Sequence, residues 1–311
     1  MTNNKILVTG GNGFLGKFVV QKLYERGIKK ENIIIPNSQS QDLRVWSNCL
    51  EVTESIEVVI HLAAKSGGIG FSQKRPGELF YDNLIMGAHI FEASRLNKIK
   101  KLVSLGTISS YPRFASVPFQ EKELWNGYPE ESNAPYGLAK KMMLVQAQAY
   151  RKQYNFNAVY LMTGNLYGPT ATLDPERSHV IPSLIKKIND AKSHNKKYIE
   201  VWGSADTTRD FLYVEDAAEG IVLATEKYNE TDPVNIGSGS EISIGSVVEI
   251  IASEMNYNGE IKWQDTTKEG SSRKSLSTKE AEIKFGFKAK TSFEEGLIKT
   301  VNWYKNKLQS I

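Results

Sequence analysis

The chain has 311 residues, of which 40% are hydrophobic and 24% are charged, an ordinary globular composition with enough length for two domains. Its net charge of +4 is too small to predict a nucleic-acid partner, and the densest basic stretch, residues 186–197, contains Asp190 and no interleaved aromatic residues. No apolar run reaches the roughly 18 residues of a membrane span, and a strand predicted from Lys5 leaves no room for a signal peptide. The lone Cys49 excludes an internal disulfide, which fits a reducing compartment. From these features together we expect a cytoplasmic protein without membrane or nucleic-acid partners.

The N-terminal segment shows the order strand, glycine turn, helix. Lys5–Thr9 (KILVT) is a short β-branched run typical of a buried parallel strand, and a turn rich in glycine follows it before a helical pattern begins. Glycines permit a tight turn and a close backbone approach, and the free N–H groups of a helix N-terminus can hold a pyrophosphate. The predicted dinucleotide-binding residues are Gly10, Gly13, Phe14, Leu15 and Gly16.

The second predicted strand, Asn32–Ile35, bears on the choice of dinucleotide. An acidic residue at the end of this strand would hold the ribose 2′-hydroxyl of NAD, whereas an arginine would accept the 2′-phosphate of NADP. Residues 36–41 read PNSQSQ and contain neither, and Asn12 in the glycine turn is also uncharged. A phosphate without arginine or lysine loses its strongest hydrogen bonds, so the sequence favours NAD over NADP.

Two more apolar runs continue the alternation of strands and helices. Val58–Ala64 is a predicted strand in which His61 is interpreted as a core residue, and Tyr81–Leu96 is a predicted helix. Lys101–Leu105 is the next strand. Thr107 follows it, and polar residues at the carboxyl end of a parallel strand face the ligand crevice. The alternation predicts an α/β fold with a doubly wound parallel sheet of the Rossmann type.

A tyrosine and a lysine follow one turn apart on a predicted helix. Pro135 suits a first helical turn, and residues 137–149 are rich in Ala, Leu, Met and Lys, so Tyr136 and Lys140 share a helix face. An ammonium near a phenol favours the phenolate, and we expect the pKa of Tyr136 to lie below its usual value of about 10. Such a tyrosine can exchange a proton with a substrate oxygen.

The composition becomes more polar after a predicted strand at Ala158–Met162. We place a domain boundary there, with residues 1–168 as the NAD(P)-binding Rossmann domain. Residues 169–311 then form a smaller α/β substrate-binding domain, of which about 208–238 packs back on the first. One predicted helix of this part ends at about Ala191. The other predicted helices span Val214–Lys227, Ile244–Met255 and Ser292–Lys307.

These motifs resemble the extended short-chain dehydrogenase/reductases (the NAD-dependent epimerase/dehydratase family), and within it the GDP-L-fucose synthases. The general family motifs are the glycine turn, Thr107 and the Tyr136/Lys140 pair. The narrower resemblance spans nearly the full length. Its blocks are HLAAKSGGIG from His61, LWNGYPEESNAPYGLAKK from Leu124, NLYGP from Asn165, SHVIP from Ser178, VWGS from Val201 and TRDFLYVEDAAEG from Thr208.

The resemblance implies an oxidoreductase that transfers hydride between NAD(H) and C4 of a GDP-linked hexose or heptose, in capsule or lipopolysaccharide biosynthesis. Tyr136 would exchange the proton at O4, Thr107 would be its hydrogen-bonding partner, and Lys140 would clamp the ribose. Homodimers would form through the two helices near Tyr81–Leu96 and Tyr136–Tyr150, and no metal is implied. The further implied cofactor contacts are Asn37, Ser38, Asp42, Leu43, Leu62, Ala63, Ala64 and Asn165. The implied substrate contacts are Ser66, Asn165, His179, Lys187, Trp202, Arg209 and Arg273.

Three positions depart from the GDP-L-fucose synthase pattern. Ser109 stands where that group carries a cysteine, which together with the histidine matching His179 moves protons at C3 and C5 during epimerisation. A thiol of pKa about 8.5 can do this, whereas a serine hydroxyl is too weak an acid without an activating base. Thr163-Gly164 replaces an apolar residue or proline, and residues 37–41 lack the arginines of NADP-using members.

Three functions therefore remain open. The first is an NAD(H)-linked C4 dehydrogenase or 4-ketoreductase that has lost 3,5-epimerisation. The second is a GDP-L-fucose synthase that tolerates Ser109 with help from Ser110 or a water. The third is a non-catalytic nucleotide sensor, against which the intact Thr107, Tyr136 and Lys140 argue.

Overall fold

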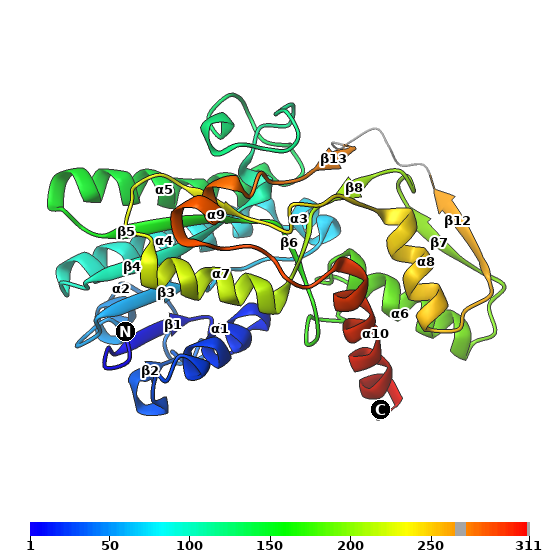
Figure 1. The fold of residues 1–311 in the computed structure, drawn as a ribbon, viewed down its shortest axis with the longest axis horizontal. Helices are drawn as coiled ribbons and strands as arrows, with labels where there is room; N and C mark the ends of the chain where they lie inside the picture. The colour runs from blue at the N-terminus through cyan, green and yellow to red at the C-terminus, as the bar shows by residue number, and fades with distance from the viewer. Residues whose placement is uncertain (265–271, 310–311) are drawn as a thin grey trace.

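A parallel sheet forms the centre of the molecule (Figure 1). The computed structural model describes residues 1–264 and 272–309, and in these residues the sheet is six-stranded with the order β10-β5-β4-β3-β1-β2. Every neighbouring pair of strands is parallel. The strand order reverses at β1, which lies between β2 and β3, and a doubly wound sheet opens its ligand crevice at such a reversal. The predicted fold class is confirmed. The strands are β1 (Ile6–Thr9), β2 (Ile33–Ile34), β3 (Val58–His61), β4 (Lys101–Thr107), β5 (Ala158–Thr163) and β10 (Val234–Ile236).

Helices cover both faces of this sheet, because its strands carry apolar side chains on both sides. Ile6 and Val8 of β1 join the core beneath α1 and α7, while Leu7 between them joins the core beneath α4 and α5. Both cores exclude water, so the strands read as continuous apolar runs. The helices are α1 (Phe14–Glu25), α2 (Trp46–Val52), α3 (Ile69–Lys74), α4 (Pro76–Leu96), α5 (Ala134–Tyr154), α6 (Val180–Ser193), α7 (Val214–Lys227), α8 (Ile244–Glu254), α9 (Lys279–Phe285) and α10 (Phe293–Gln309), with short 3-10 turns η1 (Lys30–Asn32), η2 (Ile108–Ser110) and η3 (Glu121–Glu123).

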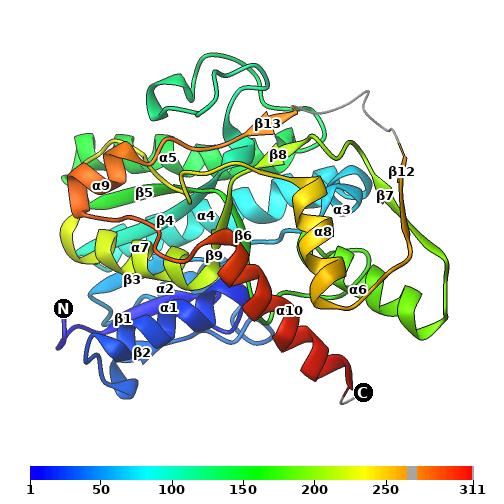
Figure 2. The same ribbon diagram turned by 45° about the vertical axis from the view of Figure 1, so that its right-hand side comes forward.

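A third apolar core lies among α6, α8 and α10. Both ribbon views place these helices, with the β7–β12 pair, beyond one end of the large sheet (Figure 1, Figure 2). Short strands connect this region to the rest of the chain: β6 pairs with β9, and β8 pairs with β11 and β13. Their bounds are β6 (Asn165–Tyr167), β7 (Tyr198–Trp202), β8 (Thr208–Arg209), β9 (Phe211–Tyr213), β11 (Ile242–Ser243), β12 (Glu260–Gln264) and β13 (Arg273–Lys274).

The long predicted elements are present, and several extend further than their patterns indicated. Helix α4 begins at Pro76 rather than Tyr81, and β4 continues to Thr107. The short α2, α3 and α9 were not predicted, because elements of six or seven residues are too brief to show a period. Cys49 lies buried in α2, and burial raises the pKa of its thiol to about 12, as a packed thiol requires. Across residues 1–264 and 272–309, the model contains no helix both long and apolar enough to cross a membrane.

Candidate active site

The glycine turn follows β1 and fits a dinucleotide pyrophosphate. Gly10 has φ +70°, and a Cβ there would lie 2.8 Å from the backbone nitrogen of Ala63. A Cβ at Gly16 would lie 2.1 Å from the carbonyl oxygen of Gly10, so only glycine lets α1 start this close to the turn. Helix α1 begins at Phe14, which Leu15 follows. Within the described residues no side chain caps this helix, so its first N–H groups can face an anion. The residues present therefore fit the group that the sequence implied.

The loop after β2 carries the predicted adenosine contacts. Asn37 and the neighbouring Ser38 form a turn in which the Asn37 side chain accepts a hydrogen bond from the backbone of Gln39 at 2.9 Å. Leu43 is buried, and the Asp42 carboxylate accepts from the Arg44 guanidinium at 2.6–3.1 Å. The guanidinium hydrogen bonds hold the pKa of Asp42 below its usual value.

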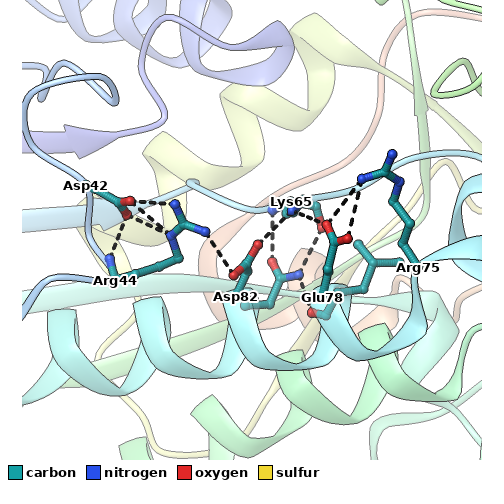
Figure 3. A network of polar contacts seen from close by, with 8 residues as sticks. Asp42, Arg44, Lys65, Arg75, Glu78 and Asp82 are labelled. Carbon is teal, nitrogen blue, oxygen red and sulfur yellow. Dashed lines mark hydrogen bonds and ion pairs between the residues drawn. The ribbon is translucent and has the colours of Figure 1, made fainter.

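A network of ion pairs connects this adenosine loop to the loop after β3 (Figure 3). Asp82 of α4 is its centre: the carboxylate accepts from Arg44 at 3.2 Å and from Lys65 at 2.8 Å, and it is only 8% exposed. Lys65 also contacts Glu78 at 2.7 Å, and the amide of Asn83 holds the Lys65 backbone through bonds of 3.0 and 2.9 Å. Helix α4 thus positions both loops, including Ser66.

Asp82→Asn is expected to raise KM for both the dinucleotide and the substrate by roughly threefold to tenfold, because it removes the charge that Arg44 and Lys65 share. We expect kcat to change less than twofold, since neither loop carries the tyrosine. Steady-state kinetics with each substrate varied would measure this. Glu78→Gln is the matched control, since it removes a carboxylate that also contacts Lys65 but is 49% exposed. Equal KM values for both variants and the wild type would contradict the role of Asp82.

The structure brings Thr107, Ser109, Tyr136 and Lys140 together. Thr107 ends β4 and caps the 3-10 turn η2, in which its hydroxyl accepts from the backbone N–H of Ser109 at 3.3 Å. This turn packs closely on the first turn of α5: a Cβ at Gly137 would lie 2.5 Å from the carbonyl oxygen of Ser109. The close packing therefore places the Thr107 and Ser109 segment beside the first turn of α5, which carries Tyr136, with Lys140 one turn further along.

The expected low pKa of Tyr136 was wrong for the protein alone. Burial raises the pKa of Tyr136 to about 12 and lowers the pKa of Lys140 to about 7. Loss of contact with water disfavours the charged form of each group, the phenolate of Tyr136 and the ammonium of Lys140. His61, at the end of β3, is buried and lies 2.8 Å from the Thr9 hydroxyl. Burial, with a smaller contribution from Lys140, lowers the pKa of His61 to about 3, consistent with a neutral core residue.

His179 lies at the start of α6, where that helix meets the loop after β3. The Gly68 N–H donates to the carbonyl of Arg177 at 3.2 Å, and a Cβ at Gly68 would lie 2.5 Å from the carbonyl oxygen of Ser178. The predicted Ser66 and His179 are thus carried by two loops in direct contact. His179 is exposed at this junction.

Lys187 and Trp202 both line a cavity of about 940 Å³. The Lys187 ammonium lies 5.8 Å from the centre of the Trp202 ring and donates to the carbonyl of Glu200 at 2.6 Å. Ser178, beside His179, lines the same cavity, as do Tyr198 and several further lysines. The cavity combines aromatic and cationic side chains.

Asn165 begins β6 and contacts Asp210, the residue that follows Arg209 between β8 and β9. The backbone and side-chain N–H groups of Asn165 both donate to the carbonyl of Asp210, at 3.0 and 3.1 Å. In the β8–β13 pair, Lys274 stands opposite Arg209, whereas Arg273 stands opposite Thr208 and forms a 2.7 Å ion pair with Glu241.

Sequence reasoning missed Lys274 and Glu130. Glu130, which lies six residues before Tyr136, forms an ion pair with Lys274. Adjacent residues of a strand point to opposite faces, and this alternation is the signal that could have favoured Lys274 over its neighbour Arg273 as the partner of Arg209. The substrate role of Arg273 stays a prediction.

The fold and these motifs define an oxidoreductase-like Rossmann protein of the extended short-chain type, and comparison with known proteins agrees. The model of the NAD dependent epimerase/dehydratase family matches residues 6–237. A GDP-L-fucose synthase from Sinorhizobium fredii is 36% identical over 302 residues, which cover 96% of this chain and 95% of the relative. The chain belongs to the NAD dependent epimerase/dehydratase family.

Solved structures of similar proteins include two enzymes of GDP-heptose metabolism. A GDP-6-OMe-4-keto-L-xylo-heptose reductase from C. jejuni has a TM-score of 0.91 and 25% identity, with 99% of each chain covered. MlghC, a GDP-mannoheptose C4 reductase from Campylobacter jejuni with NADP bound, has a TM-score of 0.87 and 26% identity, with 98% of this chain and 99% of that chain covered.

Proposed function

We propose that this protein is an oxidoreductase that acts at C4 of a GDP-linked hexose or heptose with a nicotinamide dinucleotide. The observation that carries the proposal is the close packing of η2 on the first turn of α5, which supports a site formed by Thr107, Tyr136 and Lys140 at the carboxyl ends of the strands. The relatives named above act on GDP-sugars, and the sequence resemblance covers nearly all of the chain. Dinucleotide and sugar would meet at this edge of the sheet.

The chain's own residues handle the proton of this reaction. A bound nicotinamide dinucleotide supplies or accepts the hydride. In the direction of reduction, the Tyr136 phenol donates its proton to the oxygen at C4, and Lys140 stabilises the phenolate that is left. The Thr107 hydroxyl holds the substrate oxygen in reach. In the direction of oxidation the Tyr136 phenolate takes the proton back.

The GDP part of the substrate would extend toward the C-terminal region. Arg209 and Lys274 would hold the diphosphate, because both cations lie on one face of paired strands and are largely removed from water. Lys187 and Trp202 would contact the nucleotide from their cavity. Ser66, Asn165 and His179 would contact the sugar, and Arg273 remains a further predicted contact.

We propose NADH as the preferred reductant. Asn37 and Ser38 are uncharged, and the Arg44 guanidinium already contacts two carboxylates, those of Asp42 and Asp82. A 2′-phosphate would therefore have to compete for its strongest partner in this loop. MlghC is similar over its whole length and was solved with NADP, so both dinucleotides must be compared directly.

Loss of 3,5-epimerisation is the finer part of the proposal. Ser109 lacks the acidity of a thiol, and Ser110 offers no replacement, since it is fully buried and donates to the carbonyl of Gly137 at 2.8 Å. Reduction at C4 needs neither residue. His179 would then serve as a hydrogen-bond partner of a sugar hydroxyl.

Incubation with GDP-4-keto-6-deoxymannose in D₂O, with NADH or NADPH, tests these proposals by mass spectrometry of the products. We expect reduction without deuterium at C3 or C5, and faster turnover with NADH. Deuterium at both carbons would show a working GDP-L-fucose synthase instead, and Ser109→Cys is the matched variant that should gain exchange if Ser109 is the decisive loss. If this ketone is not reduced, GDP-hexoses and GDP-heptoses with a free C4 hydroxyl are the next substrates. Dinucleotide binding without turnover of any of them would favour a sensor.

We also propose the division into residues 1–168 and 169–311, with 208–238 returning to the first part. The pairing of β10 with β5 and the packing of α7 on α1 support this division.

We propose a homodimer that forms through α4 and α5. These helices pack together and leave apolar side chains exposed, such as Tyr81 at 60% and Val145 at 43%.

A further inference from the structure

Two cations and one carboxylate lie close together between the two halves of the chain. The β8–β13 register sets Lys274 directly opposite Arg209. Glu130 forms an ion pair with Lys274, and the two side chains are only 12% and 13% exposed. The Glu130 carboxylate also raises the pKa of Arg209, although burial lowers that pKa by more. The Glu130 carboxylate therefore acts on both cations.

Among residues 1–264 and 272–309, this cluster has one more cation than anion, and the paired Lys274 and Glu130 side chains have little contact with water. Burial lowers the pKa of Lys274, Glu130 raises it, and the charge of Arg209 lowers it further. The Arg209 guanidinium donates to carbonyl oxygens, those of Thr208 at 2.7 Å and Ser272 at 3.4 Å. A second anion would relieve the repulsion, and a diphosphate carries such a charge.

Glu130 also connects this cluster to the helix that carries Tyr136. It belongs to the excursion, residues 111–133 between η2 and α5, which both ribbon views place beside β13 and over α5 (Figure 1, Figure 2). The Glu130 carbonyl accepts from the Asn133 N–H at 3.0 Å, and the Asn133 carbonyl accepts from the Gly137 N–H at 2.9 Å. Glu130 thus lies three residues before Asn133, where the first hydrogen-bonded turn of α5 begins.

We propose that Glu130 is a positioning residue that occupies Lys274 in the absence of substrate and gives it up to the diphosphate of the nucleotide-sugar. The proposal rests on the proposed function, which supplies the diphosphate. While the site is empty, the ion pair neutralises one cation and keeps Lys274 beside Arg209. When the diphosphate binds both cations, the Glu130 carboxylate repels it, which weakens binding and favours release of the product.

The test is calorimetric titration with GDP and with inorganic pyrophosphate at pH 7.0 and low salt. Glu130→Gln is expected to tighten both ligands by roughly threefold to tenfold, because a nearby like charge is removed. Glu131→Gln is the matched control: it removes the same charge from the next residue, whose side chain is exposed, and should change the Kd less than twofold. A purely structural role for Glu130 predicts the opposite sign, weaker binding.

The Lys274→Met variant tests whether Lys274 is the residue through which Glu130 affects ligand binding. This variant should weaken both ligands, and Glu130→Gln should give no tightening when added to it. In turnover, Glu130→Gln should lower KM for the sugar with kcat within twofold. Unchanged or weaker binding by Glu130→Gln would overturn the proposal. If the wild type binds pyrophosphate but not GDP, the GDP-sugar assignment fails while pyrophosphate still decides the role of Glu130.

Discussion

Replacing Tyr136 with phenylalanine is expected to lower turnover by roughly two to four orders of magnitude and to leave the binding of dinucleotide and substrate nearly unchanged. The aromatic ring is kept, while the proton that would pass to the oxygen at C4 is lost. Stopped-flow or steady-state absorbance of the reduced dinucleotide would measure turnover, and titration of intrinsic fluorescence would measure binding. Tyr154→Phe is the matched control, since it removes the same hydroxyl from an exposed position on the same helix.

The pH profile gives an independent measure of the same pair. Lys140 has a pKa of about 7, and Tyr136 one of about 12, in the free protein. The value of kcat/KM for the dinucleotide reports groups of the free enzyme, and for reduction it should fall as the pH rises through about 7. The reason is that Lys140 loses the charge that stabilises the phenolate, whereas Tyr136 keeps its proton. Near-normal turnover of Tyr136→Phe would contradict the assignment of the proton donor.

Sequence reasoning could predict the parts of the candidate site that depend on local pattern. The glycine turn follows from a strand and a helix that are adjacent in the chain, and the relation of Tyr136 to Lys140 follows from helical geometry alone. Thr107 could be placed because the carboxyl ends of parallel strands share one edge of the sheet. Each of these inferences needs only a short window of residues.

The parts that were missed depend on contacts between distant residues. Glu130 and Lys274 are 144 positions apart, and they meet only because the excursion lies beside the two-residue strand β13. The pKa of Tyr136 was predicted with the wrong sign because the depth of burial around α5 is set by packing, which the sequence does not reveal. The Asp82 network has the same origin, since α4 holds two loops that precede it by different distances in the chain.

Gly16→Ala is expected to weaken dinucleotide binding at least roughly tenfold and to lower the free energy of unfolding by about 1–3 kcal/mol. The added methyl group would lie 2.1 Å from the carbonyl oxygen of Gly10 and 2.6 Å from the Cα of Gly11. Because these are backbone atoms, the start of α1 must move away from the turn. Its N–H groups then no longer point toward the pyrophosphate. Thermal unfolding with and without NADH, together with fluorescence titration, would measure both effects.

Two further glycine variants separate stability from binding. Gly77→Ala in α4 meets nothing within 4 Å, so the better helix propensity of alanine should leave stability unchanged or raise it by up to about 1 kcal/mol. Gly13→Ala has ordinary backbone angles and only one contact, at 3.1 Å, so it should fold normally. Its methyl group nonetheless stands at the N-terminus of α1, where the pyrophosphate must approach, and should weaken NADH. If Gly13→Ala and Gly16→Ala both bound NADH as tightly as the wild type, the glycine turn would not be the dinucleotide site.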